Sequence, residues 1–191
     1  MSCFFFPYHQ NLFKVNIDVE TFISLKYICL DLALNCVSEC EDGWKEHGGK
    51  CYYFSDEKWS WVGAEEECKR NHGNGSHLAS VTDQQTDGFL AKTLNKGDTF
   101  WIGAKKTNVS NNGSWNMTWT WSDGSQWTHT SWGKVDRAIG DTSDLQEGGC
   151  AFFSKDIGNK TWWSASECDS RTTRKQFKYV CNKSICPKGS C

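Results

Sequence analysis

The chain has 191 residues, enough for one ordinary domain with a buried core and additional terminal segments. Its formal net charge is -2, so no basic surface indicates binding to nucleic acid or to an anionic membrane. Eleven cysteines indicate an oxidising compartment, and they lack the Cys-x2-Cys spacing typical of zinc sites. Asn-x-Ser/Thr sequons, candidates for N-glycosylation, also fit a secreted or cell-surface protein; they begin at Asn74, Asn108, Asn112, Asn116, Asn159 and Asn182.

Residues 1–38 differ in character from the remainder of the chain. The run Phe4-Phe5-Phe6 is too short for a signal-peptide core, and the apolar region 22–37 is interrupted by Lys26 and Asp31. No signal peptide or membrane span is legible. We therefore interpret the segment as a leader of uncertain order, either the end of a fragment or a mispredicted first exon. Partners for its cysteines are not assigned: Cys3, Cys29 and Cys36.

An organised domain is predicted to begin near Cys40. Two short β segments, each with a cysteine at its start, are separated by Gly48-Gly49. This pattern predicts a hairpin that a Cys40–Cys51 disulfide closes.

Two helices are predicted to follow the hairpin. The first covers residues 60–72, with Ser60 as its N-cap, and its buried face repeats at helical spacing through Trp61, Ala64 and Cys68. The second begins near Thr82, which forms a capping box with Gln85. Its apolar face carries Phe89, Leu90 and Leu94.

The central strand of the domain is predicted at residues 100–104. Gly103 interrupts this apolar run, and a glycine inside a strand usually marks the close approach of another backbone or a bend. Later short β-rich segments supply partners for one antiparallel core: residues 119–121, 150–153, 161–163 and 177–181. The polar residues 107–114 predict an exposed loop. The tryptophans expected in the core are Trp101, Trp119, Trp121 and Trp163.

A long irregular stretch occupies residues 127–149. Loops of this length inside a domain are usually functional or disordered. The tail, residues 183–191, carries Cys186 and Cys191, which pair with each other or with the leader, unless the chain is cut from a longer protein.

From Cys40 to Asn182 the sequence resembles a C-type lectin-like domain of the long form. The resemblance rests on several separated marks: Cys40 and Cys51, Cys68 after Trp61 and Ala64, residues 101–104 and 121–124, Cys150, Trp163 five residues before Cys168, and Cys181. It implies an α+β fold, with two helices flanking antiparallel sheets and a long irregular loop region. It also implies the disulfides Cys40–Cys51, Cys68–Cys181 and Cys150–Cys168. We accordingly divide the chain into a leader (1–38), the domain (39–182) and a cysteine-containing tail (183–191).

The best-known function of this family is Ca²⁺-dependent sugar binding, and here the sequence departs from the family pattern. The resemblance places Ca²⁺ ligands in a Glu-Pro-Asn or Gln-Pro-Asp triplet of the long loop and in Asn-Asp directly after a tryptophan. In this chain Ser164 and Ala165 follow Trp163, and the loop reads Val135-Asp136-Arg137-Ala138 without proline. Alanine cannot coordinate a cation, and an arginine opposes one. We therefore predict that the usual Ca²⁺ and sugar site is absent and that no cofactor is required.

Two binding hypotheses remain, with ligand-binding candidates at Trp127, Trp132, Asp136, Asp141, Asp144 and Glu147. The first is Ca²⁺-independent recognition of a protein or another ligand. The second is a divergent lectin that uses these loop carboxylates and exposed tryptophans, including Trp115. The alternative for the acidic residues is that they form an ordinary solvated loop, and the alternative for the tryptophans is that they pack beneath that loop.

We expect no enzyme, because the five histidines are scattered and form no catalytic motif. Cysteines without an assigned partner allow an oligomer.

Overall fold

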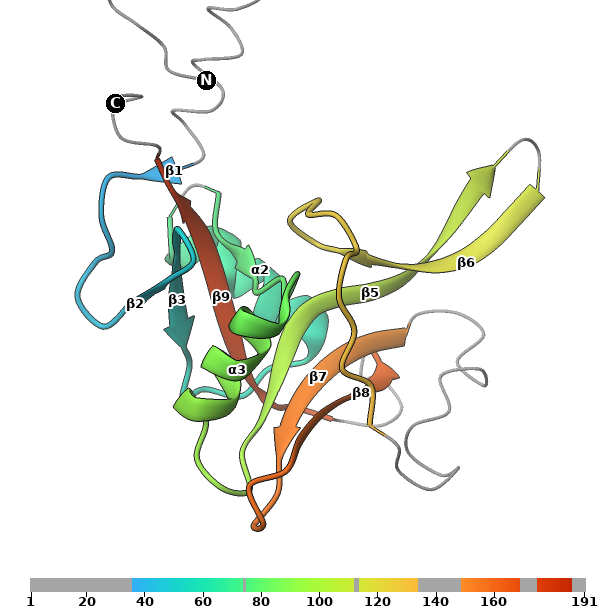
Figure 1. Ribbon diagram of the computed structural model, residues 1–191. Coiled ribbons are helices and arrows are strands. Elements are labelled where there is room, and N and C mark those ends of the chain that lie inside the picture. Colours follow the sequence, from blue (N-terminus) through green and yellow to red (C-terminus); the bar gives the residue numbers. More distant parts are fainter. Residues whose placement is uncertain (1–35, 74, 112–113, 134–148, 169–174, 187–191) are drawn as a thin grey trace, which may run out of the picture.

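The computed structural model describes residues 36–73, 75–111, 114–133, 149–168 and 175–186 (Figure 1). These residues form an α+β fold in which short strands precede and follow two helices. In chain order the elements are β1 (Cys36–Val37), β2 (Lys45–His47), β3 (Lys50–Phe54), α2 (Trp61–Asn71), β4 (His77–Leu78), α3 (Gln84–Thr93), β5 (Thr99–Asn111), β6 (Ser114–Trp121), β7 (Gly149–Lys155), β8 (Thr161–Glu167) and β9 (Lys178–Ile185).

The strands form a mixed sheet in the order β2-β3-β9-β5-β7-β8, with β1 and β4 added to β9 and β6 added to β5. Most pairs are antiparallel, but β5 and β9 run parallel, with Trp101 opposite Tyr179. The predicted all-antiparallel core is therefore wrong at the centre of the sheet. Hydrophobic patterning indicates which residues of a strand are buried, but it carries no information on the direction of its neighbour.

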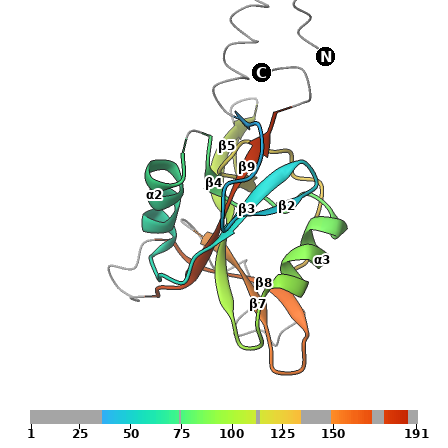
Figure 2. The same cartoon turned by 90° about the vertical axis from the view of Figure 1, so that its left-hand side faces the viewer.

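Two apolar layers lie on opposite faces of the central strands, and α2 and α3 flank the strands from two sides (Figure 2). Along β5, Ile102 packs in the layer that contains Leu90 of α3. Trp101, its neighbour, packs in the layer that contains Cys68 of α2. This alternation is the period of two that a strand imposes. Among the tryptophans expected in the core, three are buried and Trp119 is partly buried; the buried three are Trp101, Trp121 and Trp163.

At Gly103 the central strand closely approaches the backbone of Leu78. A Cβ atom at this position would clash with the carbonyl oxygen of Leu78 and would lie 2.8 Å from Ser122 Oγ. The Gly103 N–H donates to the Ala79 carbonyl (2.8 Å), and its own carbonyl accepts from Ser122 N–H (2.8 Å). The pairing of β5 with β7 also shifts register beside it. The prediction of a close backbone approach is confirmed.

The N-termini of the two helices are capped by side chains. Ser60 caps α2 as predicted, because its hydroxyl accepts from Gly63 N–H (3.2 Å). In α3 the predicted capping box is displaced by one residue: Asp83, not Thr82, is the N-cap, and its carboxylate accepts from Thr86 N–H (2.7 Å). A carboxylate one residue later satisfies a first-turn N–H and also suits the positive end of the helix dipole.

Two hairpins complete the frame. Gly48 and Gly49, with φ of +57° and +76°, form the predicted turn between β2 and β3, although Cys40 precedes β2 rather than lying in it. Residues 107–114, predicted as a loop, instead belong largely to β5 and β6, which pair up to Asn111 and Ser114. This hairpin extends away from the body of the domain (Figure 1). Period-two apolar residues at 115, 117, 119 and 121 mark β6, but residues 107–111 of β5 are almost all polar and lack this alternation, so the pattern there indicated a loop.

Four disulfides join the described residues. Three are the pairs that the family resemblance implies, namely Cys40–Cys51, Cys68–Cys181 and Cys150–Cys168. The fourth joins Cys36 of the predicted leader to Cys186 of the predicted tail, which is one of the pairings that the sequence analysis left open. With β1 at Cys36–Val37 and β9 ending at Ile185, the described fold includes residues on both sides of the predicted interval 39–182.

Candidate ligand-binding site

Five tryptophans gather where the chain enters the long loop, and we call them the tryptophan cluster: Trp119, Trp121, Trp127, Trp132 and Trp163. Trp163 is fully buried at its centre. Trp127 stacks on Trp121 with ring centroids 4.8 Å apart, and Trp132 lies 4.9 Å from Trp119. Both predicted ligand-binding tryptophans therefore pack against the core, yet each is only partly buried. They combine a fixed orientation with some accessible aromatic surface, which suits a contact residue.

Backbone pairing with β8 fixes the position of Trp132. The N–H of Trp163 donates to the Ser131 carbonyl (2.8 Å), and the N–H of Gly133 donates to the Trp163 carbonyl (3.0 Å). A Cβ atom at Gly133 would lie 2.6 Å from Cδ1 of Trp162, so the close approach requires glycine. The segment that leads into the long loop is therefore held against the sheet by backbone hydrogen bonds.

Asp87 of α3 ties this segment to the helix. Its Oδ1 accepts the indole N–H of Trp163 (2.9 Å), and its Oδ2 accepts the hydroxyl of Ser131 (3.3 Å). Burial raises the pKa of the Asp87 carboxyl, although these hydrogen bonds and the nearby His129 oppose the shift. Sequence reasoning missed Asp87, because an acidic residue in the first turn of a helix is explained by the helix dipole alone.

The residues after Trp163 are those that the resemblance relates to Ca²⁺ binding. Ser164 is fully buried, and its hydroxyl has no hydrogen-bond partner among the described residues. Ala165 carries no oxygen in its side chain. Within the described ranges no three His, Cys, Asp or Glu side chains lie close enough together to hold a metal ion. The acidic candidates lie outside the described residues: Asp136, Asp141, Asp144 and Glu147.

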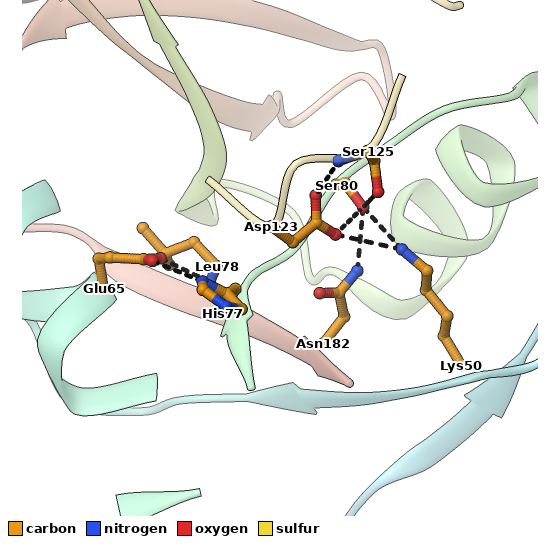
Figure 3. Close-up of polar contacts among 8 residues, drawn as sticks. All are labelled: Lys50, Glu65, His77, Leu78, Ser80, Asp123, Ser125 and Asn182. Carbon is orange, nitrogen blue, oxygen red and sulfur yellow. Dashed lines mark hydrogen bonds and ion pairs between the residues drawn. The ribbon is translucent and has the colours of Figure 1, made fainter. Parts of the chain in front are cut away.

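A second feature is a polar pocket of about 380 Å³ beside β9, which sequence reasoning did not predict. Figure 3 shows the polar contacts of this region. Asp123 Oδ2 accepts the Ser80 hydroxyl (2.6 Å) and the Lys50 ammonium (3.2 Å), while Oδ1 accepts Ser125 N–H (2.9 Å). Burial alone would raise the pKa of Asp123, but the Lys50 charge and these hydrogen bonds outweigh it and lower the pKa. The buried amide of Asn182 hydrogen-bonds Ser80 Oγ (3.2 Å).

A carboxylate orients the histidine at the other end of this pocket. Glu65 Oε1 lies 2.8 Å from His77 Nδ1, and Oε2 accepts Leu78 N–H (2.9 Å). Burial would raise the pKa of Glu65, but its hydrogen bonds to His77, Leu78 and Lys69 lower it. Because the charged side chains here are already paired with one another, the pocket offers hydrogen-bonding groups and little uncompensated charge.

The candidate glycosylation sites differ in their exposure. Asn159 is exposed in the turn between β7 and β8 and stays a glycosylation candidate. Asn182 is different, because this β9 residue is 2% exposed and its amide hydrogen-bonds Ser80 Oγ, so a glycan there would not fit the described fold. The side chains of the remaining candidates lie outside the described structure: Asn74, Asn108, Asn112 and Asn116.

Two helices flanking a mixed sheet, a tryptophan cluster around a buried tryptophan of β8, and this disulfide pattern define a lectin-like recognition domain, a class that is not typically enzymatic. The chain belongs to the C-type lectin domain family, whose pattern matches residues 57–183. It is 31% identical over 140 residues to snaclec B9 of Macrovipera lebetinus, covering 71% of this chain and 76% of that protein.

Two further comparisons show similarity to a lectin-like receptor and to a solved C-type lectin domain. Human killer cell lectin-like receptor subfamily F member 1 is 35% identical over 112 residues, which are 59% of this chain and 45% of the receptor. The chain therefore spans about half the length of this relative. The C-type lectin domain of murine dendritic cell inhibitory receptor 2, solved in complex with N-glycan, shares the fold with a TM-score of 0.59 at 22% identity, over 76% of this chain and 99% of that one.

Proposed function

We propose that this protein is an extracellular recognition module that binds a protein or another non-sugar ligand. We further propose that this binding needs no Ca²⁺. The observation that carries the proposal is on β8, where a buried serine hydroxyl and an alanine methyl follow Trp163. Asn-Asp stands there in family members that bind Ca²⁺. Hard Ca²⁺ needs six to eight oxygen ligands, and these two side chains supply at most one.

The partly buried Trp127 and Trp132 are the contact residues that we propose for the ligand. Both are held in place by the tryptophan cluster, so little conformational entropy is lost when they bind. Similarity to a lectin-like receptor supports a role in ligand recognition. Extracellular placement is supported by the four disulfides and by the relatives. Among the described residues no helix is long and apolar enough to cross a membrane.

Calcium titration and a glycan array test the proposal directly. We expect isothermal titration with Ca²⁺ to show no saturable heat, and the melting temperature to be the same in Ca²⁺ and in chelator. Any array binding should be insensitive to chelator. Chelator-sensitive sugar binding would overturn the proposal.

The second hypothesis, a divergent lectin that uses loop carboxylates, makes the opposite predictions. The partly exposed tryptophans beside the loop entry favour it, because sugar rings stack on such surfaces. In that case Asp144→Ala should abolish both Ca²⁺ binding and sugar binding. Asp56→Asn, at a carboxylate that is 96% exposed and distant in the sequence, is the matched control.

A further inference from the structure

We propose that Asp87 is the positioning residue for the Trp127 and Trp132 surface, and that His129 makes this anchor respond to pH. The inference rests on the proposed function only in assigning ligand contact to those two tryptophans. Its physical basis is the set of contacts that joins α3, β8 and the segment 127–133.

Asp87 is the point at which the three parts meet. With a side chain that is 14% exposed, it binds Trp163 of β8 through one oxygen and Ser131 through the other. A second tie to the region before α3 is the Thr128 hydroxyl, which donates to the Thr82 carbonyl (2.6 Å). Losing the carboxylate would leave the Trp163 indole N–H without its acceptor and would release Ser131. The segment that carries Trp127 and Trp132 would then no longer be held in a fixed position against α3.

His129 is placed to strengthen the same anchor when it is protonated. Its Nε2 lies 3.8 Å from Asp87 Oδ1, beyond hydrogen-bond distance, and this buried nitrogen has no hydrogen-bond partner among the described residues. The ring stands edge-on to Trp163, with centroids 5.6 Å apart. A proton on both ring nitrogens would direct a positive N–H at the carboxylate and convert a near contact into an ion pair.

The groups around His129 determine the sign of the pH response. From α3 the charged group that faces it is Asp87, and from β8 it faces the uncharged indole of Trp163. Asp83, the other carboxylate at the start of α3, is bonded to Thr86 N–H. Because the group that faces His129 is a carboxylate, a proton on the ring is attracted to it, so acidification should first tighten the anchor. Stronger acid should loosen it again as Asp87 is protonated, and the raised pKa of Asp87 brings this loss to a higher pH than for an ordinary aspartate.

Amide hydrogen exchange in the ligand-free protein tests the inference. The reporter is the Trp163 N–H, which donates to Ser131, and its rate is normalised for the intrinsic effect of pH. In the wild type we expect protection to rise about fivefold from about pH 7.5 to about pH 5.5, and to fall again near pH 4. His129→Gln should remove the rise. Asp87→Asn, which is isosteric, should lower protection at pH 7.5 and also remove the rise. Asp56→Asn should behave like the wild type.

Both parts of the inference are tested in the absence of calcium. An identical pH profile in the wild type and His129→Gln would overturn the pH response. An Asp87→Asn protein with unchanged protection and an unchanged indole N–H resonance of Trp163 would overturn the positioning role. Because no ligand or metal ion is added, either failure leaves the calcium experiment free to support or reject the proposed function.

Discussion

Removal of the Cys36–Cys186 disulfide tests how this fold is stabilised. The bond joins residues 150 positions apart, and a loop of that length, taken alone, predicts a stabilisation of about 5 kcal/mol. That value overstates the effect, because other disulfides already shorten the loop. The shortest covalent path between the two cysteines passes, in order, through Cys40, Cys51, Cys68 and Cys181.

This path contains four residues from Cys36 to Cys40, 17 from Cys51 to Cys68 and five from Cys181 to Cys186. The effective loop is therefore only about 26 residues, for which the chain-entropy relation gives about 3.5 kcal/mol. The double variant Cys36→Ser/Cys186→Ser should lose that amount of unfolding free energy. The difference of about 1.5 kcal/mol between the nested and the simple loop is large enough to measure.

The assay is guanidinium unfolding without reductant, followed by circular dichroism, with mass spectrometry to show that the other disulfides persist. The comparison variant removes Cys150–Cys168, which closes 18 residues and has no other cysteine inside its loop, so no other disulfide shortens that loop. The chain-entropy relation gives about 3 kcal/mol for that bond, to which the loss of buried sulfur adds. A loss near 5 kcal/mol for the Cys36–Cys186 variant would refute the nested-loop reasoning. A loss near zero would show that this bond does not constrain the unfolded chain.

Three further predictions follow from single side chains. Gly103→Ala should lose about 1–3 kcal/mol in the same unfolding assay, because the added methyl overpacks the backbone beside it; unchanged stability would contradict the contact geometry. Burial raises the pKa of Tyr52 from 10.0 to about 12, so its contribution to stability is complete below pH 10 and lost as the pH rises towards 12; absorbance titration and unfolding at each pH, with Tyr52→Phe as control, should show this. Burial, and next the Lys183 charge, lower the pKa of His72, so Lys183→Met should raise it in an NMR titration, and an unchanged value would exclude that coupling.

Features that depend on local spacing could be predicted from the sequence. The buried face of α2 follows from its period, and the glycine of β5 signals a close backbone approach because any Cβ there meets the Leu78 carbonyl. Ser60 was recognisable as a cap because the hydroxyl needs only the N–H three residues ahead. Each of these inferences uses residues within one turn of helix or one short strand.

Features that depend on three-dimensional assembly could not be predicted. The parallel pairing of β5 with β9 joins residues far apart in the sequence, and neither strand encodes the direction of the other. The polar pocket draws its side chains from separate segments, so Lys50, Asp123 and Asn182 look like ordinary surface or turn residues when taken singly. Asp87 is comparable: its partners lie 44 and 76 residues further along the chain.

The stabilising bonds and the proposed contact surface occupy different parts of the molecule. Strand β9 pairs with β1, β3, β4 and β5, and it carries Cys181 while the adjoining Cys186 closes the second long bond. None of the four described disulfides involves the segment 127–133, which is held by backbone bonds to β8, ring stacking and the carboxylate of Asp87. Changes in that segment should therefore alter ligand contact at a smaller cost to global stability than changes around β9. A recognition domain can in this way diverge in what it binds while its covalent frame is retained.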